Sequence, residues 1–226
     1  MREIHDHFFR EAKREGYRSR AAYKLIEIDE RRHVLSKGDL VLDCGAAPGS
    51  WLQVASPRVG GRGRILGVDL QPIEEEGLPG NVRVLEGDVL ECDVLAELGE
   101  QANVVLSDMA PSTTGTPSAD HFRSARLCDE LLDRLPQWLC KGGHCVMKVF
   151  EGEVYPDLLA RSGRMFERAK GFKPKASRSD SVEMFLVCRG FKGGDPAVDA
   201  HPPLARKKPS GWGASADDVD SADSAD

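Results

Sequence analysis

Three charged side chains lie in segments that are otherwise apolar enough to be buried strands. Lys148 lies inside HCVMKVF (144–150), Glu183 lies in SVEMFLV, and Asp108 follows the apolar run of NVVLSDM (103–109). A charge taken out of water costs free energy unless solvent or an opposite charge stabilises it. Lys148 could be structural filler that extends to water, but we expect the three residues to compensate one another in one site. A lysine and two carboxylates placed together can hold or move a proton.

A second pattern predicts a binding site for a nucleoside-like ligand. The stretch LVLDCGAAPGSW (40–51) joins a strand-like run to a loop of small residues, and a helical pattern begins near Ser50. Such a turn lets backbone N–H groups and a helix N-terminus face the ligand. The dinucleotide pattern GxGxxG would need glycine at Ala47 and one residue after Gly49. The loop therefore points to a nucleoside cofactor, and not first to NAD.

Two aspartates follow the next strand-like runs. Asp69 ends RILGVDL (64–70), 24 residues after Gly45, where an acidic group can accept hydrogen bonds from both ribose hydroxyls of a nucleoside. The alternative is an aspartate that caps a helix or turn before Pro72. Asp88, in EGDV, could contact an adenine amino group, although Gly-Asp is equally common in turns.

The pattern of elements predicts where these residues meet. Strand-like and helix-like segments alternate, which favours an α/β doubly wound fold with a mostly parallel sheet and helices on both faces. Ligands of such sheets bind at the carboxyl ends of the strands, and the polar residues expected there are Asp43, Asp69, Asp88, Asp108 and Lys148. The expected strands are 40–45, 64–70, 82–88, 103–109, 144–150 and 182–188, and the expected helices are 50–56, 93–99, 120–140 and 154–169.

The chain divides into three parts. Residues 1–37 form a helical extension, in which Ser19 is the expected N-cap of a helix that carries Ala22, Leu25 and Ile26 and ends near Lys37. Residues 38–192 hold the alternating pattern and form the main domain. Residues 193–226 are rich in Pro, Gly, Ala, Lys and Asp without periodicity, which predicts a disordered acidic tail.

Charge is unevenly distributed along the 226 residues. The net charge is −6, but the last 13 residues carry five aspartates and no base, so the other 213 residues hold about −1. Bases outnumber acids within residues 161–192 and within the first 24 residues. These two basic segments form either one nucleic-acid-binding surface or two solvated faces, and charge alone leaves both open.

Cysteine spacing and hydropathy suggest the compartment. The six cysteines form no CxxC pair and no zinc-like cluster with histidine. Cys44, Cys145 and Cys188 lie in apolar runs and are expected to be buried reduced thiols, with no metal site. No run approaches the ~18 apolar residues of a membrane span. A cytoplasmic protein with no membrane partner is the expectation.

Seven motifs in order and spacing resemble those of the FtsJ/RlmE ribose methyltransferases. The resemblance covers residues 1–191 and implies a Rossmann-like fold that uses S-adenosyl-L-methionine to methylate a ribose 2′-hydroxyl in RNA. The motifs are SRAAYKL (19–25), LDCGAAPGSW (42–51), VDLQP (68–72), EGDV (86–89), SDMAPSTTGTPSADHFRS (107–124), VMKVFEG (146–152) and SRSDSVEMFLV (177–187).

The resemblance also implies roles for individual residues. Lys148 becomes the candidate base, and the residue types leave open whether it acts as a neutral amine or orients the hydroxyl as a cation. The chain departs from many bacterial members at Ser50, where they carry a second glycine, and in its aspartate-rich tail. The implied catalytic tetrad is Lys24, Asp108, Lys148 and Glu183, and the implied cofactor-binding residues are Gly49, Trp51, Asp69, Asp88 and Asp108.

The RNA substrate is inferred from the same resemblance. It implies a monomer that modifies a uridine in the A loop of large-subunit (23S) ribosomal RNA, within the large subunit and late in its maturation, with residues 1–37 facing the RNA. The alternatives are a tRNA anticodon-loop or mRNA cap ribose methyltransferase, or a catalytically idle ribosome-assembly factor. A binding factor would not need buried, mutually compensating charges. A nicotinamide-dependent oxidoreductase fits the fold but not the loop at 45–49.

Overall fold

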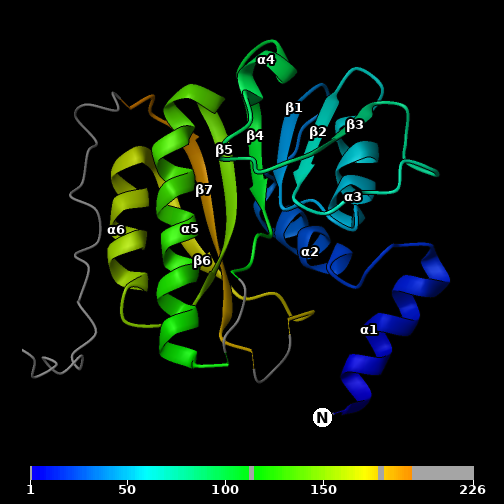
Figure 1. The fold of residues 1–226 in the computed structure, drawn as a ribbon, viewed down its shortest axis with the longest axis horizontal. Helices are drawn as coiled ribbons and strands as arrows, with labels where there is room; N and C mark the ends of the chain where they lie inside the picture. The colour runs from blue at the N-terminus through cyan, green and yellow to red at the C-terminus, as the bar shows by residue number, and fades with distance from the viewer. Residues whose placement is uncertain (1, 112–114, 178–180, 195–226) are drawn as a thin grey trace, which may run out of the picture.

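The chain forms one seven-stranded sheet with helices packed on both faces (Figure 1). The computed structural model describes residues 2–111, 115–177 and 181–194. Strands β1 to β5 run parallel in the order β3-β2-β1-β4-β5, and β7 runs antiparallel to its neighbours β5 and β6. The predicted α/β fold is confirmed. Residues 195–226, nearly all of the predicted acidic tail, lie outside the described residues.

The observed elements follow the predicted alternation closely. The strands are β1 (Leu40–Cys44), β2 (Arg64–Asp69), β3 (Val82–Glu86), β4 (Ala102–Ser107), β5 (Leu139–Phe150), β6 (Phe166–Phe172) and β7 (Glu183–Phe191). The helices are α1 (Arg2–Glu15), α2 (Ala22–Arg32), α3 (Ser50–Val59), α4 (Val94–Leu98), α5 (Pro117–Trp138) and α6 (Tyr155–Met165).

The strand order reverses between β1 and β4. From β1 the chain continues outward to β2 and β3, then returns to β4 on the other side of β1. Cys44, the last residue of β1, pairs with Ser107, the last residue of β4. The loops that follow these two strands therefore start side by side, at the place where open α/β sheets bind ligands.

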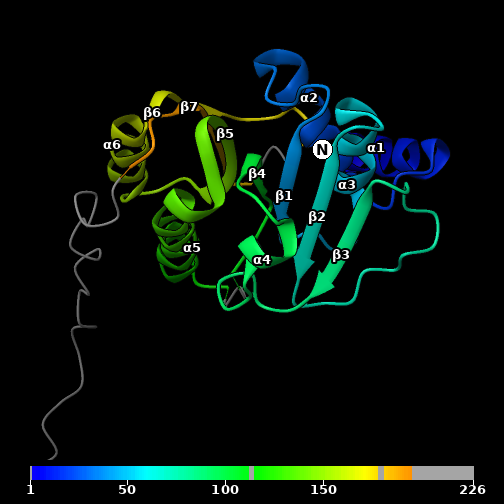
Figure 2. The same cartoon turned by 90° about the horizontal axis from the view of Figure 1, so that it is seen from above.

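Two apolar cores lie on opposite faces of the sheet. One packs α4, α5 and α6 against the strands, and the other packs α2 and α3 against the other face (Figure 2). All five residues of β1 are buried, as expected for a parallel strand covered on both sides. The six cysteines form no disulfide, and Cys44, Cys145 and Cys188 are buried as predicted.

The N-terminal region is two helices, and the second starts later than expected. Gly16, with a φ of +78°, separates α1 from α2. The residue before α2 is Ala21, so the helix starts two residues later than a Ser19 N-cap would place it, although the Ser19 hydroxyl accepts a hydrogen bond from the Ala21 N–H at 3.2 Å. The Ser19 hydroxyl also shares a hydrogen bond of 2.8 Å with the Ser50 hydroxyl at the start of α3, which ties the turn before α2 to the helix that follows the 45–49 loop.

Helix α2 also ends earlier than expected, at Arg32 and not near Lys37. The reason is the Asp29 carboxylate, which accepts hydrogen bonds from the N–H groups of Val34 and Leu35, each at 3.0 Å. In a longer helix those N–H groups would bond to backbone carbonyls. The aspartate side chain satisfies them in another conformation and so allows the helix to stop.

The predicted helix over 154–169 is wrong in its last turn. Helix α6 ends at Met165, and the next residue begins β6, an edge strand that pairs with β7. The fully buried rings of Phe166 and Phe191 pack with centroids 5.2 Å apart. This apolar contact across 25 positions of sequence favours a strand that local periodicity does not reveal.

The two basic segments meet only in part. Helix α1 lies beside α2 and α3, whereas α6 and β6 lie at the opposite side of the molecule (Figures 1 and 2). Arg161 of the second segment is buried and pairs with Asp129 and Asp133 of α5. The connection after β6 does reach α2, where the Lys175 N–H donates to Glu27 at 2.7 Å. None of the helices in the described ranges is long and apolar enough to cross a membrane.

Candidate active site

Four charged residues from four elements meet beyond the carboxyl ends of β4 and β5. Lys24 comes from α2, Asp108 follows β4, Lys148 lies near the end of β5, and Glu183 begins β7. Lys24 and Lys148 are each only 8% exposed. The structure therefore brings together the four residues of the predicted tetrad, and the expected mutual compensation of the buried charges is confirmed.

The pair of Lys24 and Glu183 forms one half of the cluster. The Lys24 ammonium lies 2.8 Å from one carboxylate oxygen and donates to the other at 2.9 Å. The Ser177 hydroxyl donates to the same carboxylate at 2.8 Å. Burial alone would raise the pKa of Glu183, but the charge and hydrogen bond of Lys24, the Ser177 hydroxyl and the Lys148 charge together lower it. Glu183 is therefore ionised at neutral pH.

The pair of Lys148 and Asp108 forms the other half. Lys148 Nζ donates to Asp108 Oδ1 at 2.7 Å and to the Asp108 backbone carbonyl at 2.5 Å. Lys24 Nζ lies 3.9 Å from the same Oδ1, so the Asp108 carboxylate sits between two lysines. Two of the three polar positions of Lys148 Nζ are thus taken by acceptors. The third is left for a substrate, as a donor in the ammonium or as the lone pair of the neutral amine.

The loop at 45–49 adopts a conformation that only glycine allows at both ends. Gly45 has a φ of +77°, and a Cβ on it would lie 2.7 Å from the Met109 side chain. Gly49 has a φ of +102°, and a Cβ on it would lie 2.9 Å from Arg18 Nη1. The loop between them leads into the N-terminus of α3, where the first N–H groups of a helix have no partner within the helix. The N–H groups of Gly45, Ala46, Ala47 and Gly49 are bonded to Val68, Asp69 and Ala46.

The predicted cofactor-binding aspartates make different contacts. Asp69 accepts hydrogen bonds from the N–H groups of Ala47 at 2.9 Å and Gln71 at 2.8 Å, so it joins the 45–49 loop to the end of β2. Asp88 is exposed and accepts from the Leu90 N–H at 3.0 Å, which is the turn contact that the sequence left open. Both carboxylates keep further lone pairs for a ligand.

Trp51 is placed where its side chain cannot reach a cofactor. Its indole is 3% exposed, donates from Nε1 to the Ala21 carbonyl at 2.8 Å and packs on Phe185 with ring centroids 5.8 Å apart. Its position as the second residue of α3 leaves the backbone for ligand contact. The indole anchors α3 to Ala21 before α2, and the cofactor contact of Trp51 stays a prediction that concerns its backbone.

Asp43 is a site residue to which sequence reasoning assigned no role. It lies in β1, is 1% exposed, and neither carboxylate oxygen has a hydrogen-bond partner among the described residues. Burial, followed by the charges of Asp108 and Asp69, raises its pKa well above the ordinary value. The signal was visible as an acidic residue in the apolar run LVLDC. An unpartnered buried carboxylate suits a cationic group, such as the amino group of an amino-acid-bearing nucleoside.

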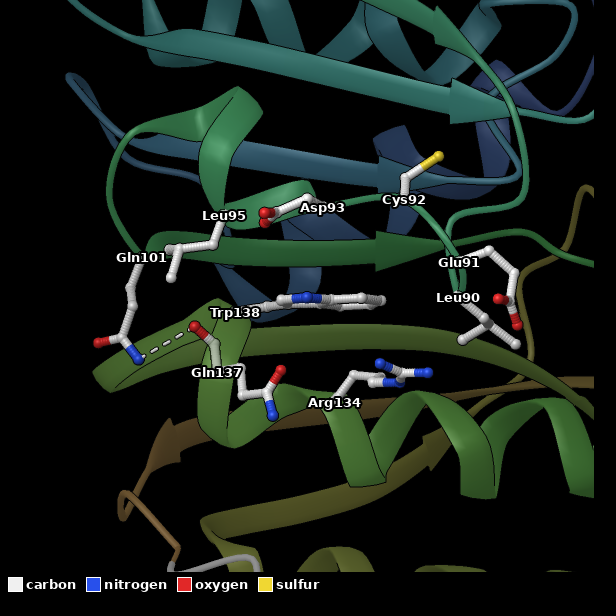
Figure 3. Close-up of a pocket in the computed structure, with 9 residues that line it drawn as sticks. All are labelled: Leu90, Glu91, Cys92, Asp93, Leu95, Gln101, Arg134, Gln137 and Trp138. Carbon is white, nitrogen blue, oxygen red and sulfur yellow. Dashed lines mark hydrogen bonds between the residues drawn. The ribbon is translucent and has the colours of Figure 1, made fainter.

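A cavity of about 530 Å³ lies elsewhere, between α4 and the end of α5 (Figure 3). None of the predicted site residues lines it, so it is separate from the charged cluster. Its lining residues are Leu90, Glu91, Cys92, Asp93, Leu95, Gln101, Arg134, Gln137 and Trp138.

Comparison with known proteins explains the arrangement. Residues 17–191 match the model of the FtsJ-like methyltransferase family. The chain belongs to this family. Within the matched range lie the whole charged cluster, the 45–49 loop and every predicted cofactor-binding residue.

Relatives of this FtsJ-like methyltransferase match over most of their length. The chain is 46% identical over 198 residues to ribosomal RNA large subunit methyltransferase E of Nitratidesulfovibrio vulgaris, covering 85% of this chain and 98% of the relative. It is 42% identical over 193 residues to the protein of the same name from Methanothermobacter thermautotrophicus, covering 83% and 90%.

Solved structures share the fold. A Plasmodium falciparum protein described as a ribosomal RNA methyltransferase superposes with a TM-score of 0.71 at 30% identity, over 79% of this chain and all of that chain. Aeropyrum pernix fibrillarin, solved with natively bound S-adenosyl-L-methionine, has a TM-score of 0.55 at 17% identity, over 74% and 75%. The second likeness shows a common fold.

Proposed function

We propose that this FtsJ-like methyltransferase transfers a methyl group from S-adenosyl-L-methionine to a ribose 2′-hydroxyl of large-subunit ribosomal RNA. The observation that carries the proposal is the cluster of Lys24, Asp108, Lys148 and Glu183 beside the 45–49 loop. The names of the relatives supply the RNA, because they are ribosomal RNA large subunit methyltransferases.

The residues at the ends of β1 and β2 fit the methyl donor. The unpartnered Asp43 carboxylate would hold its amino group, and Asp69 would hold its ribose hydroxyls. Asp88 would contact the adenine. The backbone of Gly49 and Trp51, at the N-terminus of α3, would contact the bound cofactor. Bound S-adenosyl-L-methionine supplies a methyl group on an activated sulfonium leaving group. The protein has to orient the 2′-hydroxyl and remove its proton.

The charged cluster is built for that task. Lys148 Nζ has one polar position left after its two bonds to Asp108. In the neutral amine this position is the lone pair, which would accept the proton of the 2′-hydroxyl as the oxygen attacks the methyl group and the sulfonium leaves as the neutral thioether. Asp108 fixes the orientation of Lys148. Lys24, held by Glu183, provides a second positive group that stabilises the developing negative charge on the ribose oxygen.

The nucleotide that is methylated is inferred from the resemblance of residues 1–191 to the FtsJ/RlmE family. It is a uridine of the A loop of 23S ribosomal RNA, methylated in the cytoplasm by a monomer acting on the large subunit late in its maturation. Residues 1–37 face the RNA as an extension of the methyltransferase domain at 38–192. The position of α1 (Arg2–Glu15) outside the α/β body supports an extension over that helix (Figure 1), whereas α2 packs on the sheet with α3. The shape of the subunit would supply the specificity that no sequence-reading motif provides.

A labelling experiment tests the function and its alternatives together. Purified protein and S-adenosyl-L-methionine with a labelled methyl group are incubated with large ribosomal subunits from a strain that lacks this gene, and in parallel with tRNA and capped mRNA. We expect label in the large-subunit RNA, located by mass mapping as a single 2′-O-methyluridine. Label in tRNA alone, or in the mRNA cap alone, would identify that RNA as the substrate in place of ribosomal RNA. Tight subunit binding without label would indicate an assembly factor.

A further inference from the structure

The segment between α1 and α2 holds the start of α3 from outside the sheet. Gln53 of α3 accepts from the Arg18 N–H at 2.8 Å and donates to the Gly16 carbonyl at 3.0 Å. The Ser19 and Ser50 hydroxyls share a bond of 2.8 Å, and the Trp51 indole donates to the Ala21 carbonyl. Residues 16–21, which we call the clasp, are thereby fixed to the helix that follows the 45–49 loop.

Arg18 extends the clasp to two loops at once. Its guanidinium donates from Nη1 to the Pro48 carbonyl at 3.0 Å and from Nη2 to the Glu76 carbonyl at 2.7 Å. Pro48 belongs to the loop after β1, and Glu76 belongs to the connection between β2 and β3. A planar guanidinium can hold two acceptors in one fixed geometry, which a lysine ammonium on a flexible stem does not reproduce.

Gly49 lies directly beneath the Arg18 side chain. A Cβ at this position would lie 2.9 Å from Arg18 Nη1 and 3.4 Å from the Ile73 side chain. The loop is thus enclosed between the Arg18 side chain and the β2–β3 connection. The φ of +102° at Gly49 favours glycine there, and the absence of a side chain leaves room for the Arg18 guanidinium.

The two loops that Arg18 joins also flank Asp69. Its carboxylate accepts from the Ala47 N–H in the first loop and from the Gln71 N–H in the β2–β3 connection. Asp69 therefore joins the two loops at the strand ends, and Arg18 joins them on the outside. Without the outer connection, the two bonds of Asp69 would have to hold the loops together by themselves, so we expect the loops to separate more readily and the Asp69 carboxylate to be held less firmly.

We infer that Arg18 is a positioning residue for the methyl donor: by holding the Pro48 and Glu76 carbonyls together, it keeps the 45–49 loop and Asp69 in the geometry that binds the nucleoside. The inference presupposes the proposed function, because it concerns the same cofactor. Arg18 also lies six residues before Lys24 on the same stretch of chain. The clasp therefore ties the binding side of the active site to the segment that leads into the catalytic helix.

The competing role for Arg18 is contact with an RNA phosphate. A phosphate contact depends chiefly on positive charge, whereas the clasp depends on the two-pronged guanidinium. Arg18→Lys keeps the charge and removes the fork, so it separates the two roles. Arg18→Ala removes both. Arg14→Ala is the matched control, because Arg14 is an exposed arginine on α1 that pairs only with acids of its own region among the contacts described.

The test is calorimetric titration of each protein with S-adenosyl-L-methionine in the absence of RNA. We expect Arg18→Lys and Arg18→Ala to raise the cofactor Kd about tenfold, the loss typical of a charge-assisted hydrogen bond. Arg14→Ala should match the wild type. In turnover, Arg18→Lys should raise the KM for the cofactor while kcat and the KM for large subunits change little. A merely structural role would lower the melting temperature and reduce kcat in proportion to the folded fraction.

Hydrogen exchange supplies a second measurement that needs neither ligand nor activity. In Arg18→Lys without ligand, the amides of residues 45–50 and 71–79 should exchange faster, while those of β1 and β4 stay protected. An unchanged cofactor Kd in Arg18→Lys together with unchanged exchange would overturn the inference. So would a normal cofactor Kd with weaker RNA binding in Arg18→Ala, which would assign Arg18 to the RNA. The wild-type titration tests the cofactor itself, so a failure there concerns the proposed function and not Arg18.

Discussion

At the carboxyl ends of β4 and β5 two buried lysines pair with two part-buried carboxylates, whereas at the end of β1 one carboxylate is buried alone. Lys24 pairs with Glu183, and Lys148 pairs with Asp108. Asp43 has no partner among the described residues, and burial raises its pKa. The proposed catalytic side is therefore already paired in the ligand-free protein. The cofactor side carries an electrostatic cost that a cationic ligand can relieve.

The largest expected effect comes from the paired side. Lys148→Ala should reduce methyl transfer about 10²–10⁴-fold, the usual contribution of a positioned acid or base, because the 2′-hydroxyl loses its proton acceptor. The cofactor Kd should stay close to that of the wild type, since Lys148 contacts Asp108 and not the 45–49 loop. Single-turnover kinetics measures the rate of methyl transfer, and calorimetry measures the cofactor Kd. Full activity in this variant would remove Lys148 from the mechanism.

Asp43→Asn tests the unpaired carboxylate at the end of β1. It should weaken cofactor binding but stabilise the ligand-free protein. The cofactor Kd should rise at least about tenfold, because a charge-assisted hydrogen bond becomes a neutral one. The ligand-free variant should melt at a higher temperature than the wild type at neutral pH.

The pH dependence of the Asp43 variant follows from the sign of the shift. A raised pKa in the folded protein means that the wild type loses stability as pH rises from the unfolded value through the folded one. Asparagine does not titrate, so the advantage of the variant should vanish near pH 4 and grow toward higher pH. Thermal melts across this range check it, and a variant less stable than wild type at every pH would contradict an unpaired Asp43.

Asp69→Ala should weaken cofactor binding about tenfold, through the lost ribose contact and the released Ala47 N–H. The matched control is Asp88→Ala, which removes an exposed carboxylate that bonds a turn. Its effect on the cofactor Kd should be smaller. Equal Kd values for Asp69→Ala and the wild type would refute the ribose contact.

Ser177→Ala should give the smallest effect, about 1 kcal/mol of unfolding free energy at neutral pH, because Glu183 loses one of its donors. Glu183 has a lowered pKa, so its contribution to stability is present above the unfolded value and is lost as pH falls through the folded one. The difference between variant and wild type should therefore shrink below about pH 4. Urea unfolding at several pH values measures the difference in unfolding free energy. A difference that persists in acid would show that the loss of stability does not come from the ionised Glu183 carboxylate.

Much of the fold was predictable because most strands are continuous apolar runs. Six of the seven strands and the strand-end positions of Asp69, Asp108 and Lys148 follow from such runs. The missed strand β6 starts at Phe166 directly after α6, without a turn residue to mark the change. The early end of α2 depends on the Asp29 side chain and two N–H groups five and six residues away. Neither feature has a periodic signature.

By itself, the sequence determined which charges had to be buried, because an ionisable residue in an apolar strand is visible in any single chain. Its motifs also indicated the family. Only the tertiary structure decided which charges pair, since Lys24 and Glu183 meet across 159 positions of sequence. It also decided that Asp43 has no partner among the described residues, that the Trp51 indole lies in the core, and that Arg18 joins two loops. Pairing depends on distances of a few ångströms between elements far apart in the chain, and residue type and spacing do not encode those distances.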